Sequence, residues 1–239
     1  MGDQKTVSNK KIKKVTLSEA LLKWFDISKR KLPFRDINNP YKIWVSEIML
    51  QQTKVNTMIP YYNNWITKFP NISSVAKSTQ DEVLKYWEGL GYYSRCRNFY
   101  NAAKIVCEKF NSIVPNNWSD FRALPGVGDY TSGAVLSIAF NKPYIALDGN
   151  VKRVMARLTG KLHMTKYNIN LIKSKLYKLM DYKRPGDFNQ AMMDLGSIIC
   201  RSTKPICIKC PIKKSCKGYL NNHPDTHHLM LCKVCFVIW

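Results

Sequence analysis

The chain has 239 residues, of which 45% are hydrophobic, so it can bury one large core or two smaller ones. Lysine and arginine number 38 against 16 acidic residues, and the formal net charge of +22 predicts a polyanionic partner and salt-sensitive binding. The sequence has no apolar run long enough to span a membrane and no hydrophobic signal peptide, so we expect neither a membrane protein nor export.

The chain begins with a basic segment followed by a helical pattern. Residues 1–15 are polar and carry a lysine cluster, and we expect a flexible arm, with a nuclear address or a phosphate-binding arm as the alternatives. Thr16 and Glu19 have the spacing of a capping box, which predicts a helix that begins here and ends before Pro33. Its apolar face would bury Leu17, Ala20, Leu21, Trp24 and Phe25.

Residues 42–58 predict a second helix, in which Glu47 lies among apolar residues. Apolar neighbours disfavour an ionised carboxylate, so we expect the pKa of Glu47 to be raised, as a general acid at neutral pH requires. The alternative is a surface glutamate on an amphipathic helix. The residues that follow form a polar cluster suited to base edges or phosphates: Gln51, Gln52 and Thr53.

A glycine-rich turn at residues 89–93 separates one capped helix from another helix predicted over residues 94–110. The turn carries Tyr92 and Tyr93, and Arg95 follows closely. Aromatic rings beside arginines can stack on bases and hold phosphates. The alternative is that the tyrosines pack in the core.

The sequence LPGVG at residues 124–128 predicts a tight hairpin between two helices. Pro125 cannot continue a helix, and Gly126 and Gly128 can adopt positive φ and let the backbone approach a ligand. N–H groups at such a turn, beside the start of a helix, form an anion site that fits a phosphate; an ordinary helix–turn–helix corner is the alternative. The residues expected to contact a nucleic-acid backbone are Leu124, Gly126, Val127 and Gly128.

Asp129 can cap the helix after the hairpin, and Asp148 follows that helix within the sequence LDGN. If the hairpin holds a nucleic-acid phosphate, Asp148 would be held against a sugar. Residues 169–181 and 187–199 predict two further amphipathic helices. Since no convincing period-two run indicates a strand, we predict an all-α fold.

The cysteine spacing near the end of the chain is the most specific signal. Cys200, Cys207, Cys210 and Cys216 follow the pattern C-x6-C-x2-C-x5-C. In a chain without an export signal, such cysteines indicate thiols or metal ligands rather than disulfides. Four thiolates in one short loop can enclose a cubane [4Fe-4S] iron–sulfur cluster, and tetrahedral zinc or four free thiols are the alternatives.

Together these motifs resemble the helix-hairpin-helix DNA glycosylases of the endonuclease III superfamily, and within it the MutY-type adenine DNA glycosylases. The matching segments run in order from about Leu32 to Cys216: LPFR, VSEIMLQQTKV, GLGYYSRCRN, LPGVGDYTSGA, LDGNVKRV, FNQAMMDLG and the cysteine loop. The resemblance implies a two-lobed helical fold with an iron–sulfur cluster loop and DNA across the cleft between the lobes. The implied parts are a six-helix lobe over 38–144, a lobe combining 16–37 with 145–216, and a disordered tail over 217–239.

The resemblance also implies roles for single residues. Glu47 matches the acid that protonates N7 of adenine, and Asp148 matches the carboxylate that stabilises or attacks the cationic sugar, with Asn150 as its orienting partner. Tyr130 stands where lyase members carry a catalytic lysine. The residues that match the duplex wedge are Gln52 and Tyr92, and those that match the adenine pocket are Arg30, Phe34 and Gln190.

The implied activity is hydrolysis of the N-glycosidic bond of adenine mispaired with oxidised guanine, or guanine, in double-stranded DNA by a monomer in base excision repair. One alternative is an endonuclease III-like glycosylase and lyase for oxidised pyrimidines, which needs an amine where this chain has Tyr130. Another is a non-catalytic iron–sulfur DNA-binding module. The domain that reads oxidised guanine is expected to be absent after Cys216. The expected compartment is the nucleus or mitochondrion in a eukaryote, and otherwise the cytoplasm.

Overall fold

The structure is a computed structural model, and it describes residues 15–160 and 165–221. The predicted basic arm, except for Val15, and the predicted tail beyond residue 221 lie outside the described residues. Every regular element in the described ranges is helical, as predicted. None of these helices is both long and apolar enough to cross a membrane.

The helices before the hairpin are α1 (Leu17–Ser28), α2 (Pro40–Met49), α3 (Val55–Lys68), α4 (Ile72–Lys77), α5 (Gln80–Lys85), α6 (Ser94–Lys109) and α7 (Trp118–Arg122). The helices after it are α8 (Asp129–Phe140), α9 (Gly149–Thr159), α10 (Lys166–Leu179), α11 (Pro185–Asp194) and α12 (Lys217–Leu220). A π-helical turn at Leu195–Ile199 and short 3-10 turns at Cys207–Lys209 and Lys213–Ser215 separate α11 from α12.

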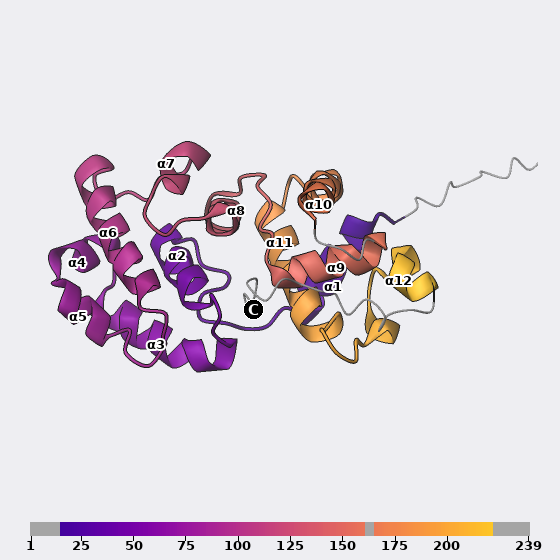
Figure 1. Ribbon diagram of the computed structural model, residues 1–239, viewed down its shortest axis with the longest axis horizontal. Helices are drawn as coiled ribbons and strands as arrows, with labels where there is room; N and C mark the ends of the chain where they lie inside the picture. The colour runs from indigo at the N-terminus through magenta and orange to yellow at the C-terminus, as the bar shows by residue number, and fades with distance from the viewer. Residues whose placement is uncertain (1–14, 161–164, 222–239) are drawn as a thin grey trace, which may run out of the picture.

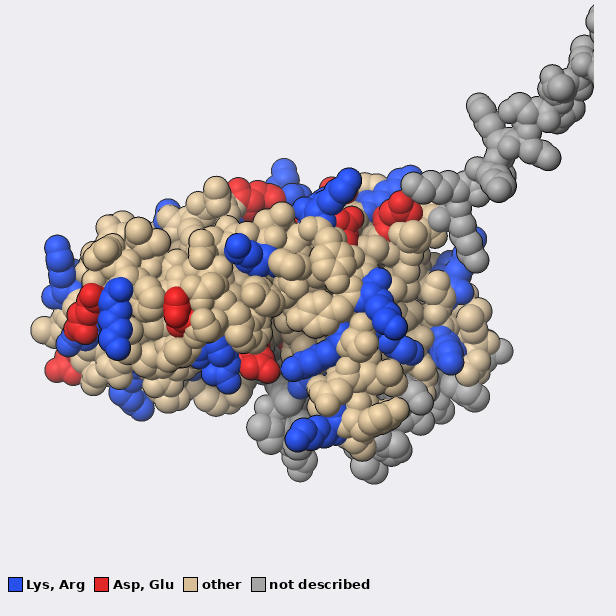
Figure 2. Space-filling view, turned by 90° about the horizontal axis from the view of Figure 1, so that it is seen from above, with Lys and Arg blue, Asp and Glu red and all other residues tan. Residues whose placement is uncertain are grey.

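The helices form two groups joined at α8. Helices α2 to α7 lie on one side of the molecule, and α1 with α9 to α12 lies on the other (Figure 1). Helix α8 packs against α2 and α7 on the first side and against α11 on the second. Lys and Arg side chains spread over both groups on the face in Figure 2, as expected for a net charge of +22. The arrangement brings residues of both groups to α8.

The core of the first group is built from large aromatic side chains. Trp44 on α2 lies edge-on to Phe99 of α6 and to Phe121 of α7, with ring centroids 4.9 Å apart in both pairs. Trp65 of α3 and Trp87 also meet edge-on, at 5.7 Å. Such pairs add stability beyond the area that they bury. They fix α2, which carries Glu47, against α6 and α7.

The N-terminal capping box is confirmed, but the helix predicted over residues 42–58 is wrong. Thr16 accepts from the Glu19 amide and donates its own amide to the Glu19 carboxylate. Helix α2 instead begins at Pro40, after the cap Asn39, and ends at Met49. The chain then turns, with Gln52 in the left-handed region at φ +60°, before α3 begins. The sequence prediction therefore assigned helix to the turn in which Gln52 is exposed.

The two other local differences lie close to the functional region. Gly128, rather than Asp129, caps α8, and its φ of −97° is not left-handed, whereas Gly126 adopts φ +75°. The helix predicted over 187–199 is two elements, because α11 ends at Asp194 and a π-helical turn follows. π-Helical turns are rare and often occur at functional sites. A Cβ atom at Gly196 in this turn would lie only 2.6 Å from the Cβ atom of Asn150, so only glycine fits.

Candidate active site

Glu47 lies in an apolar setting on α2. Its side chain is only 1% exposed, and its neighbours Trp44 and Ile48 are also buried. The Tyr130 hydroxyl of α8 donates a hydrogen bond to Glu47 Oε2 at 2.7 Å. The same hydroxyl oxygen lies 3.5 Å from Sδ of Met193 on α11. The predicted burial of Glu47 is confirmed, and the alternative of a surface glutamate is wrong.

Asp148 is the N-cap of α9 and is 2% exposed. Its carboxylate accepts from the Val151 amide at 2.6 Å and from Asn150 Nδ2 at 2.9 Å. Burial raises the pKa of Asp148 to about 6, and the hydrogen bonds and the nearby Arg153 charge limit that rise. The carboxylate is therefore mostly ionised at neutral pH despite its burial.

A chain of polar contacts leads from Asp148 to the cysteine loop. Arg153 Nη2 donates to Asn150 Oδ1 at 2.7 Å and to the Gly196 carbonyl at 2.8 Å, and its Nε donates to the Cys200 carbonyl at 2.9 Å. Burial lowers the pKa of Arg153. Arg153 was not among the residues predicted from the sequence, although its position one helical turn after Asn150 could have indicated it. The residue that orients Asp148 is thus itself fixed by Arg153.

Helix α8 connects the two carboxyl groups. Tyr130 on this helix contacts Glu47, and Gly133, one turn later, lies against the segment that leads to Asp148. A Cβ atom at Gly133 would be 2.1 Å from the Ile145 carbonyl oxygen, so a larger residue would push that segment away. Asn189 of α11 reinforces the contact, because its Oδ1 accepts from the Ala146 amide at 3.1 Å.

A cleft opens beside Tyr130, between α7 and α8 on one side and α9 and α10 on the other. Lys152 of α9 and Lys173 of α10 contribute positive charge to its walls. The complete lining is Trp118, Asp129, Tyr130, Ile145, Leu147, Lys152, Ile169, Lys173 and Tyr177. The cleft therefore lies between the two helix groups and has basic and aromatic walls.

The predicted hairpin forms, and its apolar residues serve as anchors. Leu124 and Val127 are each 4% exposed, so their side chains point into the core, whereas Gly126 is exposed. Arg122 braces the turn, because its Nη1 donates to the Val127 carbonyl at 2.8 Å. Arg122 also pairs with Asp129 at 3.0 Å, so Asp129 is held by an ion pair instead of capping α8. Contacts of this hairpin with a ligand would therefore be made by its backbone.

The residues predicted to contact DNA from the turns after α2 and before α6 separate into two types. Gln52 is exposed and Tyr92 is 57% exposed, so the alternative that both tyrosines of the glycine-rich turn pack in the core is wrong. Thr53, in contrast, is 7% exposed, and Gln51 donates its side-chain amide to Thr131 Oγ1 at 3.3 Å. Gln51 and Thr53 thus support the turn from inside, while Gln52 and Tyr92 project from the surface.

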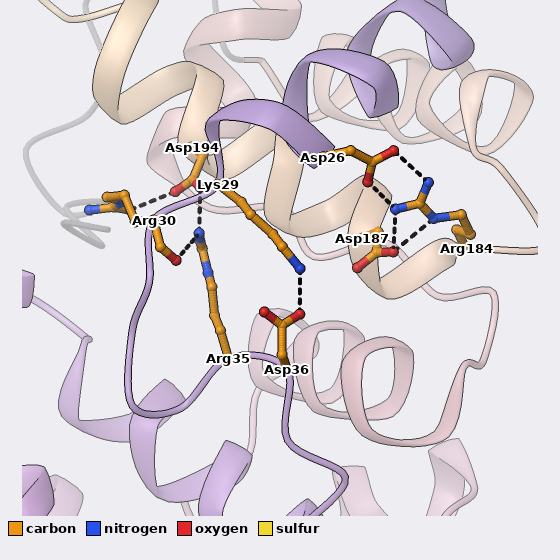
Figure 3. A network of polar contacts seen from close by, with 8 residues as sticks. All are labelled: Asp26, Lys29, Arg30, Arg35, Asp36, Arg184, Asp187 and Asp194. Atoms are coloured by element: carbon orange, nitrogen blue, oxygen red, sulfur yellow. Dashed lines mark hydrogen bonds and ion pairs between the residues drawn. The ribbon is translucent and has the colours of Figure 1, made fainter.

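Two of the residues predicted to line a base pocket belong to α11 or contact it: Gln190 lies on this helix, and Arg30 pairs with Asp194 at its end. Gln190 and Phe34 are buried, at 8% and 3% exposure. Arg30 forms an ion pair with the buried Asp194 at 2.6 Å, and Arg35 pairs with the other oxygen of Asp194 at 2.7 Å (Figure 3). The segment between α1 and α2 is thereby fastened to α11. Arg35 and Asp194 were not predicted from the sequence, since nothing in the sequence connects two charges so far apart.

The four cysteines of the loop line one cavity, together with Arg157, Ile199, Lys213, Gly218 and Tyr219. In the described residues, no three His, Cys, Asp or Glu side chains gather closely around a single metal position. Arg157 is buried, and its Nη1 lies 3.4 Å from Cys200 Sγ and donates to the Arg201 carbonyl at 2.6 Å. The cavity therefore combines four sulfur donors with a buried positive charge.

Comparisons with known proteins agree on the family. The model of the HhH-GPD superfamily base excision DNA repair protein matches residues 45–173. The chain is 45% identical over 205 residues to the adenine DNA glycosylase of Buchnera aphidicola subsp. Baizongia pistaciae, covering 85% of this chain and 58% of that protein. It is 40% identical over 212 residues to the adenine DNA glycosylase of Homo sapiens, covering 83% of this chain and 38% of that protein. The chain thus spans less than two thirds of these relatives.

Solved structures show the same fold. A thermostable thymine-DNA glycosylase superposes with a TM-score of 0.79 at 29% identity, covering 85% of this chain and 95% of that one. A trapped covalent endonuclease III–DNA intermediate superposes with a TM-score of 0.72 at 22% identity, covering 86% of this chain and 94% of that one. The two-group helical arrangement is therefore shared with proteins that act on DNA.

Proposed function

Because this chain belongs to the HhH-GPD superfamily of base excision DNA repair proteins, we propose that it is a monofunctional adenine DNA glycosylase. Its reaction would be hydrolysis of the N-glycosidic bond of adenine mispaired with oxidised guanine or guanine in double-stranded DNA, with the protein acting as a monomer. The observation that carries the proposal is the pair of buried carboxyl groups: Glu47 accepts from Tyr130 of α8, and Asp148 follows the segment that packs against Gly133 of the same helix.

The two carboxyl groups fit the two demands of the reaction. Adenine is a poor leaving group until it is protonated, and departure of the base leaves positive charge on the sugar. Glu47 would protonate N7 of adenine, because an apolar setting favours the neutral acid. Asp148 would stabilise the cationic sugar, or attack it, because its hydrogen-bond donors favour the anion. Asn150 would hold Asp148 in its orientation.

The rest of the site would position the nucleotide. The target base must leave the duplex stack before it can reach Glu47. Gln52 and Tyr92, which are exposed, would enter the duplex as the base leaves. Backbone N–H groups of the hairpin would hold a phosphate, and the predicted phosphate contacts are those of Leu124, Gly126, Val127 and Gly128. The base pocket would be lined by Phe34 and Gln190, with Arg30 held beside it by Asp194.

The cysteine cavity is proposed to hold a [4Fe-4S] cluster, with tetrahedral zinc as the alternative. A cubane takes one thiolate at each of its four irons, and the four cysteines that line this cavity would supply them. The cluster would supply structural cross-linking of residues 200–216. Iron and sulfide analysis and the absorption spectrum of the purified protein would test the assignment.

The two alternatives are less well supported. An endonuclease III-like lyase needs an amine near the sugar to form a Schiff base, and the phenol of Tyr130 cannot form one. Borohydride trapping of a covalent DNA adduct discriminates, because a lyase is trapped efficiently. A non-catalytic DNA-binding module has no need of two buried carboxyl groups, which cost stability when they are ionised.

The decisive experiment is base release from duplexes that differ only in the target pair. We expect single-turnover release of adenine opposite oxidised guanine and opposite guanine. Duplexes with thymine opposite guanine or with an oxidised pyrimidine are the comparison arms, and we expect them to stay intact. Release of thymine or of the oxidised pyrimidine in preference to adenine would overturn the substrate assignment.

The bacterial relatives favour action in the cytoplasm of a bacterial cell.

A further inference from the structure

Arg95 is placed unusually for an arginine in so basic a protein, because its guanidinium points into the protein at the junction of two turns. The first, called here the Gln52 turn, comprises residues 50–54 after α2. The second, called here the Tyr92 turn, comprises residues 89–93 before α6. These two turns carry the exposed side chains proposed to enter the duplex.

The guanidinium of Arg95 binds backbone carbonyl groups on both sides of this junction. Its Nη1 donates to the carbonyl of Ile48 at 2.8 Å, to that of Met49 at 3.1 Å, and to that of Gln51. Its Nη2 donates to the carbonyls of Leu90 at 3.4 Å and Gly91 at 3.2 Å. The planar fork of arginine can serve several acceptors in fixed directions, which lysine cannot. One side chain therefore joins the two turns.

The other surroundings of Arg95 are aromatic. Its guanidinium carbon lies 5.3 Å from the ring centroid of Trp87 and 5.3 Å from that of Tyr92. Within the described part of the chain, the ion pairs involve other residues and give Arg95 no carboxylate partner. Burial lowers the pKa of Arg95 to about 10, so it keeps its charge at neutral pH. The residue is thus a half-buried cation stabilised by carbonyl dipoles and aromatic rings.

The contacts of Arg95 fall at strained points of the backbone. Gln52 has φ +60° and Tyr92 has φ +49°, a left-handed conformation that side-chain-bearing residues seldom adopt. Arg95 binds the carbonyl of the residue immediately before each of them, Gln51 and Gly91. Such conformations persist only when surrounding contacts over-determine them. Arg95 supplies contacts of this kind to both turns at once.

We propose that Arg95 is a positioning residue for base extrusion, which locks the Gln52 and Tyr92 turns together so that both side chains enter the duplex as one rigid wedge. The proposal rests on the proposed function, because a wedge is needed only if a base leaves the stack. Rigid pre-organisation matters here, since entering the duplex with mobile side chains would cost additional ordering entropy. Loss of Arg95 should therefore impair extrusion more than it impairs DNA binding.

The test separates extrusion from catalysis and from simple loss of charge. Glu47→Gln provides a background without base release, and 2-aminopurine beside the target adenine reports loss of stacking by a rise in fluorescence. Arg95→Met is compared with Arg97→Met, which removes the same charge from an exposed position on α6. At saturating protein we expect the full fluorescence rise with Arg97→Met and loss of most of it with Arg95→Met. In proteins with Glu47 intact, Arg95→Met should slow adenine release about 10- to 100-fold.

A second measurement tests the coupling of the two turns in the free protein. In hydrogen–deuterium exchange, peptides covering residues 50–54 and 89–93 should become faster together in Arg95→Lys, which keeps the charge but lacks the planar fork. If Arg95→Met fails to fold, the fluorescence measurement is made with the milder variant Arg95→Lys instead. A full fluorescence rise in a folded Arg95 variant, or faster exchange in only one turn, would overturn the proposal. Absence of adenine release by the unmodified protein would instead refute the proposed function, and the fluorescence readout does not depend on release.

Discussion

The two carboxyl groups of the site are held in opposite ways. Glu47 is surrounded by apolar side chains, and Tyr130 donates to it from the neighbouring helix. Asp148 is equally buried, but it receives a backbone amide, the amide of Asn150 and the field of Arg153. Burial alone would favour the neutral form of both groups, and the donors around Asp148 limit the rise of its pKa. Under the proposed function, Glu47 would give a proton and Asp148 would remain an anion.

The two groups also depend on different structural supports. Glu47 is fixed by hydrophobic packing of α2 against α6, α7 and α8. Asp148 is fixed by a polar chain through Asn150 and Arg153 to the carbonyl of Cys200. Disruption of the cysteine loop should therefore displace the Asp148 side chain and leave the position of Glu47 unchanged.

The largest effect is expected from Glu47→Gln. Glutamine keeps the size of the side chain and an oxygen that can accept from Tyr130, but it cannot donate a proton to adenine. Adenine release should fall about 10²- to 10⁴-fold, the usual contribution of general acid catalysis. Single-turnover release measures the loss, and gel-shift titration should give nearly unchanged duplex affinity. Normal release by this variant would remove Glu47 from the mechanism.

Arg153→Met should have the next largest effect, through Asp148. Loss of the contact to Asn150 should slow release about 10- to 100-fold, since small misplacements of reacting groups are costly. The Arg153 charge lowers the pKa of Asp148, so its removal should move the acid limb of the rate–pH profile from near pH 6 to higher pH. Rates measured across about pH 5 to 9 would show the shift.

The matched control for this prediction is Arg153→Lys. Lysine keeps the positive charge but cannot bind Asn150, Gly196 and Cys200 together. We expect a slower rate with the acid limb near its original position. An unchanged acid limb in Arg153→Met as well would show that the electrostatic link to Asp148 is unimportant.

Sequence reasoning was sufficient where the signal is local. The capping box at Thr16 predicted the start of α1, and the apolar residues around Glu47 raised its burial as one of two interpretations. It failed where a distant side chain decides the local structure. The chain breaks after Met49, where Arg95 binds the last carbonyls of α2 and the carbonyl of Gln51 in the turn, and no helical propensity around residue 50 reports such a partner. Arg153 was missed for a related reason, because two of its partners, Gly196 and Cys200, lie far from it in the sequence.

Tyr130→Phe should have a smaller effect on the glutamate side. It removes the hydroxyl that donates to Glu47 at 2.7 Å and leaves the ring between α2 and α11. A single hydrogen bond contributes about 0.5–1.5 kcal/mol, so adenine release should slow about 2- to 10-fold. Single-turnover rates would test this, and an unchanged acid limb would show that the aspartate side is undisturbed. A loss as large as that of Glu47→Gln would mean that the phenol takes part in proton transfer.

The smallest effect concerns stability on the aspartate side. The pKa of Asp148 rises from 3.8 to about 6 on folding, which corresponds to a cost of about 3 kcal/mol for keeping the buried group ionised at neutral pH. Asp148→Asn removes this charge and can still accept from the Val151 amide. Its new amide group would face Asn150 Nδ2, and because both groups are hydrogen-bond donors, this contact would reduce the gain. We therefore expect a net gain of about 1–2 kcal/mol in the free energy of unfolding.

The pH dependence of this gain identifies its cause. Because folding raises the pKa of Asp148, the folded state is penalised once pH exceeds about 4, and the penalty is complete above about pH 6. The advantage of Asp148→Asn in denaturant titrations should therefore be largest near pH 7.5 and shrink toward pH 4.5, while adenine release is lost throughout. A gain that is constant with pH would come from packing, and a loss of stability would mean that the hydrogen bonds of Asp148 outweigh the cost of burying its charge.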